Sequence, residues 1–192
     1  EGVCGVRIGG VDLKYGTDSP DSDEVKELYA YFGHSFYCAN ILEFGVVNAL
    51  CTLDLLEKRE DFPDKEVWKN IIDKHYDDSF KNSFGKLLKK IELHRKSIPE
   101  LESVVSAVTA CVDRRNFLAH HFWREHATSL FTKEGRAKMI KELEEASELF
   151  FRTDQALEKL IQPIDDRYGI TAEARSAEFD RMIQEVMKRN IR

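Results

Sequence analysis

Three side chains near the middle of the chain are of the types needed for phosphoryl chemistry. Arg115 offers a planar fork of N–H donors that suits phosphate oxygens, and Asn116 adds an amide that can orient a neighbour. His120 brings an imidazole, a side chain that often moves protons in catalysis. Phosphoryl transfer without a metal needs a nucleophile, a proton shuttle, and positive charge at the phosphoryl transition state. Arg115 and His120 are of the types that supply the last two.

The spacing of these residues leaves their geometry open. Asn116 and His120 are four residues apart, so they are neighbours on a continuous helix. Arg115 and His120 are five apart, which separates them by roughly 140° on an ideal helix. A bend, a helix end near Leu118, or a second subunit would be needed to bring them together.

Arg115 also interrupts an apolar stripe. Leu101, Val108 and Phe122 follow one another at multiples of seven residues, and Arg115 occupies the same face between Val108 and Phe122. Burying an unpaired charge costs several kcal/mol. Arg115 must therefore face a polar cavity, have a partner, or follow the end of the helix. A structural alternative is that an Arg and a His near a helix C-terminus favour its dipole and last carbonyls.

Neighbouring residues could extend such a site. Arg114 and His121 are seven apart and share a helix face, and with Arg124 they are candidate phosphate contacts. A solvated helix edge explains them equally well. His121 could also be the working histidine in place of His120.

The overall charge gives little support for nucleic-acid binding, because the net charge of the 192 residues is −6. Basic residues gather at 86–96, where Lys89 and Lys90 could hold RNA phosphates or form a solvated helix face. We expect no membrane span. The cysteines are unevenly spaced, without a C-x-x-C pair, which favours a reducing, cytoplasmic location: Cys4, Cys38, Cys51 and Cys111.

Hydrophobic periodicity predicts an all-α helical bundle of four to six helices. Residues 1–22 are expected to form a tail that contains a short strand at Val3–Ile8. The core domain covers 23–165, and a C-terminal helix within 166–192 packs on it. The predicted core helices are one long helix or two in line over 23–56, a short one over 67–72, one starting at 77–79, one from 99 into Arg115, and a long charged one over 135–164.

Arg115-Asn116-Phe117-Leu118-Ala119-His120 resembles the signature of the HEPN superfamily, in which an Arg and a polar residue are followed by a His. Phe84-Gly85-Lys86-Leu87-Leu88 looks like the Gly-x-Leu element often seen upstream. The resemblance covers roughly residues 24–165 and implies a dimeric helical bundle. It also implies metal-independent endoribonuclease activity giving a 2′,3′-cyclic phosphate, as in toxins and in defence or stress proteins. No cofactor is expected; the implied partners are RNA, a second copy and, in some members, an antitoxin protein.

Two alternatives stay open. HEPN domains also serve as non-catalytic dimerisation or partner-binding modules. Some toxins are modified at a tyrosine two residues after the histidine, where this chain has Phe122. The other alternative is a metal site, whose candidate ligands are His120, His121, Glu125 and His126.

Overall fold

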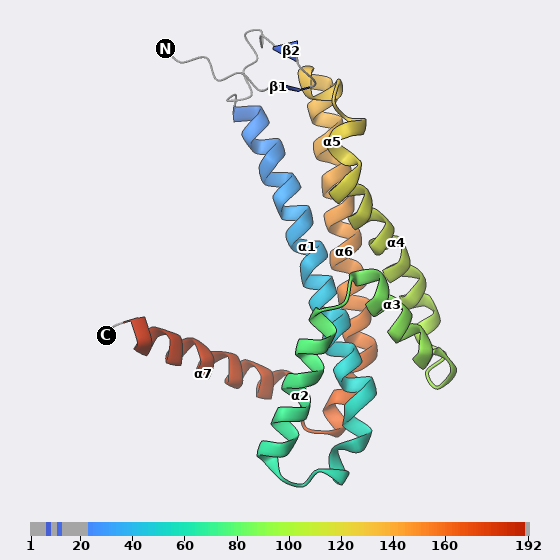
Figure 1. Cartoon of the computed structure of the whole chain (residues 1–192), viewed down its shortest axis with the longest axis vertical. Helices are drawn as coiled ribbons and strands as arrows, with labels where there is room; N and C mark the ends of the chain where they lie inside the picture. Colours follow the sequence, from blue (N-terminus) through green and yellow to red (C-terminus); the bar gives the residue numbers. More distant parts are fainter. Residues whose placement is uncertain (1–6, 9–10, 13–22, 191–192) are drawn as a thin grey trace. The chain divides into compact units, whose positions relative to one another are not determined.

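The chain is helical apart from one short strand pair in the part that the computed structural model describes, residues 7–8, 11–12 and 23–190 (Figure 1). These ranges contain seven α-helices, of which five are substantial, and this confirms the predicted fold class. The helices are α1 (Asp23–Leu55), α2 (Lys65–Phe80), α3 (Phe84–Glu92), α4 (Leu101–His120), α5 (Phe122–Glu125), α6 (Lys133–Arg167) and α7 (Ala172–Asn190). Three short 3-10 helices lie between them, at Leu56–Asp61, Leu93–Lys96 and Ser129–Phe131.

Most of the predicted tail at 1–22 lies outside the described residues. Within it, β1 (Arg7–Ile8) pairs antiparallel with β2 (Val11–Asp12). The expected strand at Val3–Ile8 is therefore described only at its last two residues.

Helix α1 is a single helix, with Asp23 and Glu24 at the positive end of its dipole. By length and composition it could cross a membrane, which contradicts the expectation that no segment could. The reason is that Glu43 is the one Asp, Glu, Lys or Arg between Leu28 and Leu53. The core helix of a globular protein passes the same test. Buried positions recur along α1 every three or four residues, as in such a helix: Val25, Leu28, Ser35, Ala39, Leu42 and Val46.

The predicted helix start at Asp77-Asp78-Ser79 is wrong, because α2 runs unbroken through these residues. Asp64 caps its N-terminus by accepting from the backbone N–H groups of Glu66 and Val67. Helix α2 ends at Phe80, and the side-chain amide of Asn82 donates to the Asp78 carbonyl just beyond it. Helix α3 begins at Phe84. Acidic residues are typical of the first turn of a helix, where they stabilise its dipole, and Asp77 and Asp78 therefore suggested a helix start. In the structure they lie in the last turn of α2, where their charge opposes the dipole.

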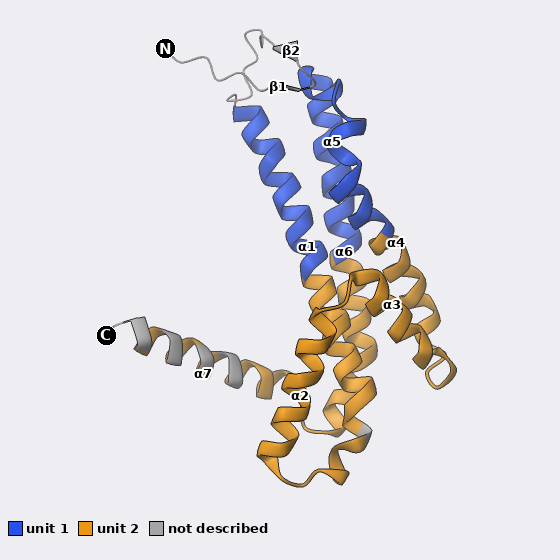
Figure 2. Cartoon of the chain, viewed as in Figure 1, with its two compact units in different colours: residues 1–40, 113–150 blue, residues 41–112, 151–192 orange. Residues whose placement is uncertain are grey.

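Two compact units divide the chain, and α1, α4 and α6 contribute to both (Figure 2). Unit 1 comprises residues 1–40 and 113–150. Its core includes Leu28, Leu118, Phe122, Met139, Leu143 and Phe150. Polar contacts tie α1 to α6 here: Ser35 donates to the Leu143 carbonyl at 2.7 Å, and the buried Arg136 guanidinium bonds Glu24.

Unit 2 comprises residues 41–112 and 151–192. Its core includes Leu42, Val46, Leu50, Leu87, Ile91, Leu101, Val108, Leu157 and Ile161. Helix α6 ends in a turn where Gly169 has a φ of 76°, and Ile170 N–H reaches back to the Asp165 carbonyl at 3.0 Å. Thr171 then caps α7, close to the predicted start of the last helix. The described side chains of α7 are all exposed, and its packing on the bundle stays a prediction.

Candidate functional site

Helix α4 carries the Arg115–His120 motif and continues without a break to His120. Leu118 is buried, and the His121 backbone N–H donates to the Phe117 carbonyl at 2.8 Å, so the helical bonding extends past the motif. A helix end near Leu118, one of the three ways to bring Arg115 and His120 together, is therefore absent.

Arg115 is half-buried, and none of the described acidic side chains pairs with it. Its Nη1 donates to the Asn116 Oδ1 at 3.4 Å, at the long end of hydrogen bonding. Its Nε is buried and has no hydrogen-bond partner in the described part of the chain. Such a donor left alone is costly, and a functional contact is one common explanation.

His120 is exposed at the end of α4. Its ring lies 6.4 Å from that of His121. No hydrogen bond or ion pair joins His120 to Arg115 or Asn116 among the described residues. Among the described residues, Arg115 and Asn116 are therefore in contact, and neither is bonded to His120.

Arg114 has a different environment from its neighbour Arg115. Its Nη1 lies 2.8 Å from Glu142 Oε1, and its guanidinium lies over the Phe117 ring at 5.6 Å. The other oxygen of Glu142 is 2.8 Å from His126 Nε2. Glu142 therefore already compensates the charge of Arg114, which had been a candidate phosphate contact.

His121 and Arg124 contact each other on the turn after α4. Arg124 Nη2 donates to His121 Nδ1 at 2.7 Å, and the His121 ring stacks on Phe117 with an interplanar angle of 25°. Because Nδ1 accepts this bond, the imidazole proton of a neutral His121 is on Nε2. Both side chains are exposed, so these candidate phosphate contacts form a local pair.

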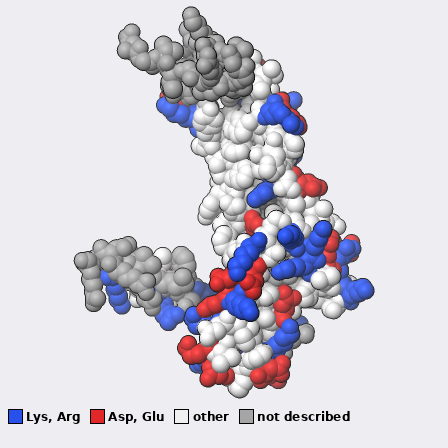
Figure 3. Space-filling view, in the orientation of Figure 1, with Lys and Arg blue, Asp and Glu red and all other residues white. Residues whose placement is uncertain are grey.

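Lys89 and Lys90 lie in the last turn of α3, which belongs to unit 2. Figure 3 shows Lys and Arg side chains gathered over this helix. Lys89 is exposed and Lys90 half-buried. The buried stripe of α3 is Phe84, Leu87, Leu88 and Ile91, so the basic residues occupy the opposite face, as periodicity predicts.

The metal site considered as an alternative is not formed. Within the described residues, no three His, Cys, Asp or Glu side chains gather where they could hold a metal ion. His126 is instead bonded to Glu142, and His121 to Arg124.

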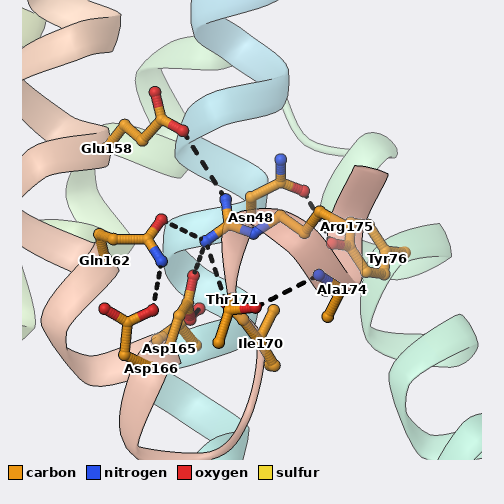
Figure 4. A network of polar contacts seen from close by, with 11 residues as sticks. Asn48, Tyr76, Glu158, Gln162, Asp165, Asp166, Ile170, Thr171, Ala174 and Arg175 are labelled. Carbon is orange, nitrogen blue, oxygen red and sulfur yellow. Dashed lines mark hydrogen bonds and ion pairs between the residues drawn. The ribbon is translucent and has the colours of Figure 1, made fainter. Parts of the chain in front are cut away.

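Sequence patterns did not reveal a polar network in unit 2 (Figure 4). Asp165 is buried, accepts from Thr52 Oγ1 at 2.7 Å, and lies 2.8 Å from Arg175 Nη2. Arg175 also donates to Gln162 Oε1 at 2.7 Å, while Tyr76 donates to Asn48 Oδ1 at 2.7 Å. These residues come from α1, α2, α6 and α7, and their separation along the chain hides the network.

A second cluster in unit 2 also went unpredicted. Asp54 lies between two histidines, with Oδ1 2.7 Å from His94 Nε2 and Oδ2 3.4 Å from His75 Nε2. Burial lowers the pKa of His75, and this effect exceeds the opposing one of Asp54. The cluster ties the 3-10 helix after α3 to α1.

Comparison with known proteins gives no relative: no family model, no curated protein and no solved structure matches the chain.

Proposed function

We propose that this chain is a metal-independent endoribonuclease of HEPN type that acts as a homodimer in the cytoplasm. RNA is its substrate, and Arg115, Asn116 and His120 are its catalytic residues. The one observation that carries the proposal is the half-buried Arg115 guanidinium, which lacks an acidic partner in the described chain and keeps a buried Nε–H unbonded. A cation in this state is free to bind a phosphate.

A second copy completes the proposed site. Arg115 and His120 do not meet within one chain, so a cleft shared by two copies would place the arginine of one beside the histidine of the other. It would also concentrate positive charge locally, despite the net charge of −6.

In the proposed reaction the ribose 2′-oxygen attacks phosphorus and the bond from phosphorus to the 5′-oxygen breaks. One imidazole takes the proton of the 2′-OH, and the imidazole of the other copy gives a proton to the leaving 5′-oxygen. Arg115 stabilises the charge on the phosphoryl oxygens, and Asn116 orients the guanidinium that it already contacts. The products are a 2′,3′-cyclic phosphate and a 5′-OH.

The test is to incubate purified protein with single-stranded RNA in excess EDTA and to map the ends of the products. We expect cleavage that leaves 5′-OH ends and is lost in His120→Ala and Arg115→Ala. Lys138→Ala is the matched control, because Lys138 is an exposed cation of unit 1 outside the motif. His121→Ala distinguishes the two histidines: cleavage should persist in this variant if His120 is the catalytic one. Intact RNA under every condition, or equal cleavage by all variants, contradicts the proposal.

A non-catalytic dimerisation or partner-binding module is the second candidate. It is favoured by the separation of Arg115 from His120 in the single chain. Its signature would be a stable dimer by light scattering without RNA cleavage. If the chain is a toxin, an antitoxin protein would be its partner. Control by modification two residues after His120 is excluded, because Phe122 has no hydroxyl and is fully buried.

A further inference from the structure

Unit 2 contains a pocket of about 300 Å³ between α1, α6 and the start of α7. Ile41, Phe44, Leu157 and Ile161 give it an apolar wall. Asp154 and Glu158 lie on the α6 side, one helical turn apart. A volume of this size is at the lower end of pockets that hold small molecules, which combine apolar walls with a few placed polar groups.

Asp154 is the carboxylate of this pocket without a described partner, and its oxygens are not among the fully buried, unbonded atoms. It is half-buried, yet its carboxylate has no hydrogen-bond or ion-pair partner in the described part of the chain. Gly45 on α1 makes room for it: a Cβ at this position would lie 2.2 Å from Asp154 Oδ1. The absence of a side chain at residue 45 therefore leaves space for the carboxylate beside the α1 backbone.

The other charges around the pocket are accounted for. Asp165 is compensated by Arg175 and accepts from Thr52. Glu158 lies 3.8 Å from Arg175 Nη1, and its side chain is 63 % exposed, so this pairing is weak. Three carboxylates and one guanidinium line the pocket, which leaves it electronegative around Asp154.

We propose that this pocket binds a small organic ammonium ion, with the charged nitrogen on the Asp154 carboxylate and an apolar body against Phe44, Leu157 and Ile161. An ammonium would supply the hydrogen-bond donors that Asp154 lacks, and the apolar wall favours a hydrocarbon or aryl group over a bare inorganic cation. This inference does not depend on RNA cleavage.

The protonation of Asp154 agrees with this assignment. Burial, and then the charge of Glu158, raise the pKa of its carboxyl group. A bound cation favours the ionised carboxylate and so opposes both effects. Ammonium binding should therefore release a proton near the raised pKa and weaken as the pH falls through it.

The experiment is calorimetric titration of the full chain with three probes of similar shape: 2-phenylethylammonium, 2-phenylethanol and 3-phenylpropionate. We expect one-site binding of the ammonium alone. Asp154→Asn, which keeps the shape and removes the charge, should weaken binding by roughly tenfold or more. Gly45→Ala should weaken it as well, because the new Cβ displaces the carboxylate.

Asp77→Asn is the matched control, since Asp77 is an exposed carboxylate of unit 2 outside the pocket. Thermal melts verify that each variant is folded. The proposal is overturned if the folded protein does not bind the ammonium at millimolar concentrations. Equal binding of 2-phenylethanol, or unchanged affinity in Asp154→Asn, also overturns it.

Discussion

Two arginines in different units of the molecule have opposite surroundings. Arg175 of unit 2 contacts Asp165, Gln162 and Glu158, and so its donors are largely engaged. Arg115 of unit 1 has a single 3.4 Å contact with its neighbour Asn116 and a buried Nε that nothing in the described chain accepts. The contacts of Arg175 stabilise unit 2. Among the described residues Arg115 lacks such contacts, which lowers stability but leaves its guanidinium without a counter-ion.

The difference teaches where to look for function in a helical bundle. Exposure does not predict the difference, because Arg175 is the more exposed of the two arginines and yet the better paired. What separates them is whether the hydrogen-bonding capacity of each polar group is met within the chain. Arg115 meets this criterion and Asp154 has no described partner, so both are candidates for external partners, whereas Asp165 and Arg114 are paired within the chain.

The largest expected effect is on stability, from Asp165→Ala. The change removes the acceptor of the buried Thr52 hydroxyl and the closest anionic partner of Arg175, and leaving both donors without Asp165 should cost about 3 kcal/mol. Asp166→Ala is the adjacent control: Asp166 is exposed and accepts from Gln162, so its loss should cost less than about 1 kcal/mol. Urea unfolding measures both. Equal losses would mean that the network does not stabilise unit 2.

The next effect concerns RNA cleavage. Arg115→Ala should lower the cleavage rate by about a hundredfold or more, because a donor aimed at the transition state is lost. Arg114→Ala should have a smaller effect, since Glu142 already compensates its charge. Single-turnover rates on one RNA substrate provide the measurement. A larger loss for Arg114→Ala would reverse the assignment of the two arginines.

Two glycines of α1 extend the comparison to packing. Gly45→Ala should gain no stability, because its Cβ forces the Asp154 carboxylate to turn away, and this cost offsets the better helix propensity of alanine. A Cβ at Gly33 meets nothing within 4 Å, so Gly33→Ala should stabilise by about 0.5–1 kcal/mol through better helix propensity. The urea midpoint should rise for Gly33→Ala and not for Gly45→Ala, and an equal rise in both variants would refute the packing argument.

The smallest expected effect is the pH dependence of Asp154. Its raised pKa means that the folded chain holds a proton where the unfolded chain has lost it. Stability from this group is therefore lost as the pH rises from the unfolded pKa through the folded one. Asp154→Asn should stabilise the chain at neutral pH by no more than about 1 kcal/mol, since solvent screens a half-exposed carboxylate. Below the unfolded pKa the gain should vanish in urea unfolding.

Local patterns predicted much of the fold. The apolar spacing of α1, α4 and α6 gave the helical class, and Pro99 and Gly169 lie close to helix boundaries. The prediction failed at Asp77–Ser79, where acidic residues end a helix instead of starting one. The acidic residues at 77–78 mark a helix boundary. Whether that boundary is a start or an end depends on tertiary packing, which the neighbouring residues do not encode.

The candidate site was predictable only in part. The spacing of Arg115 and His120 predicts that they lie on different faces of α4, and no described bond joins the two side chains. The pairing of Arg114 with Glu142 could not be predicted, because the two residues are 28 positions apart and no sequence pattern links them. The same holds for Asp165, whose partners Thr52 and Arg175 lie on other helices. A sequence shows which residues carry charge, but tertiary structure decides which charges are neutralised.

Each unit is built from two separate segments of the chain, and this limits where the protein can be truncated. Unit 1 ends one of its segments at residue 40 and resumes at 113, and both points fall inside helices. A truncation at either boundary would leave half a helix with an exposed apolar stripe. The boundary in α4 is also only two positions before Arg115. Neither unit is one continuous stretch of chain, so a folded fragment would have to keep α1 through α6 intact.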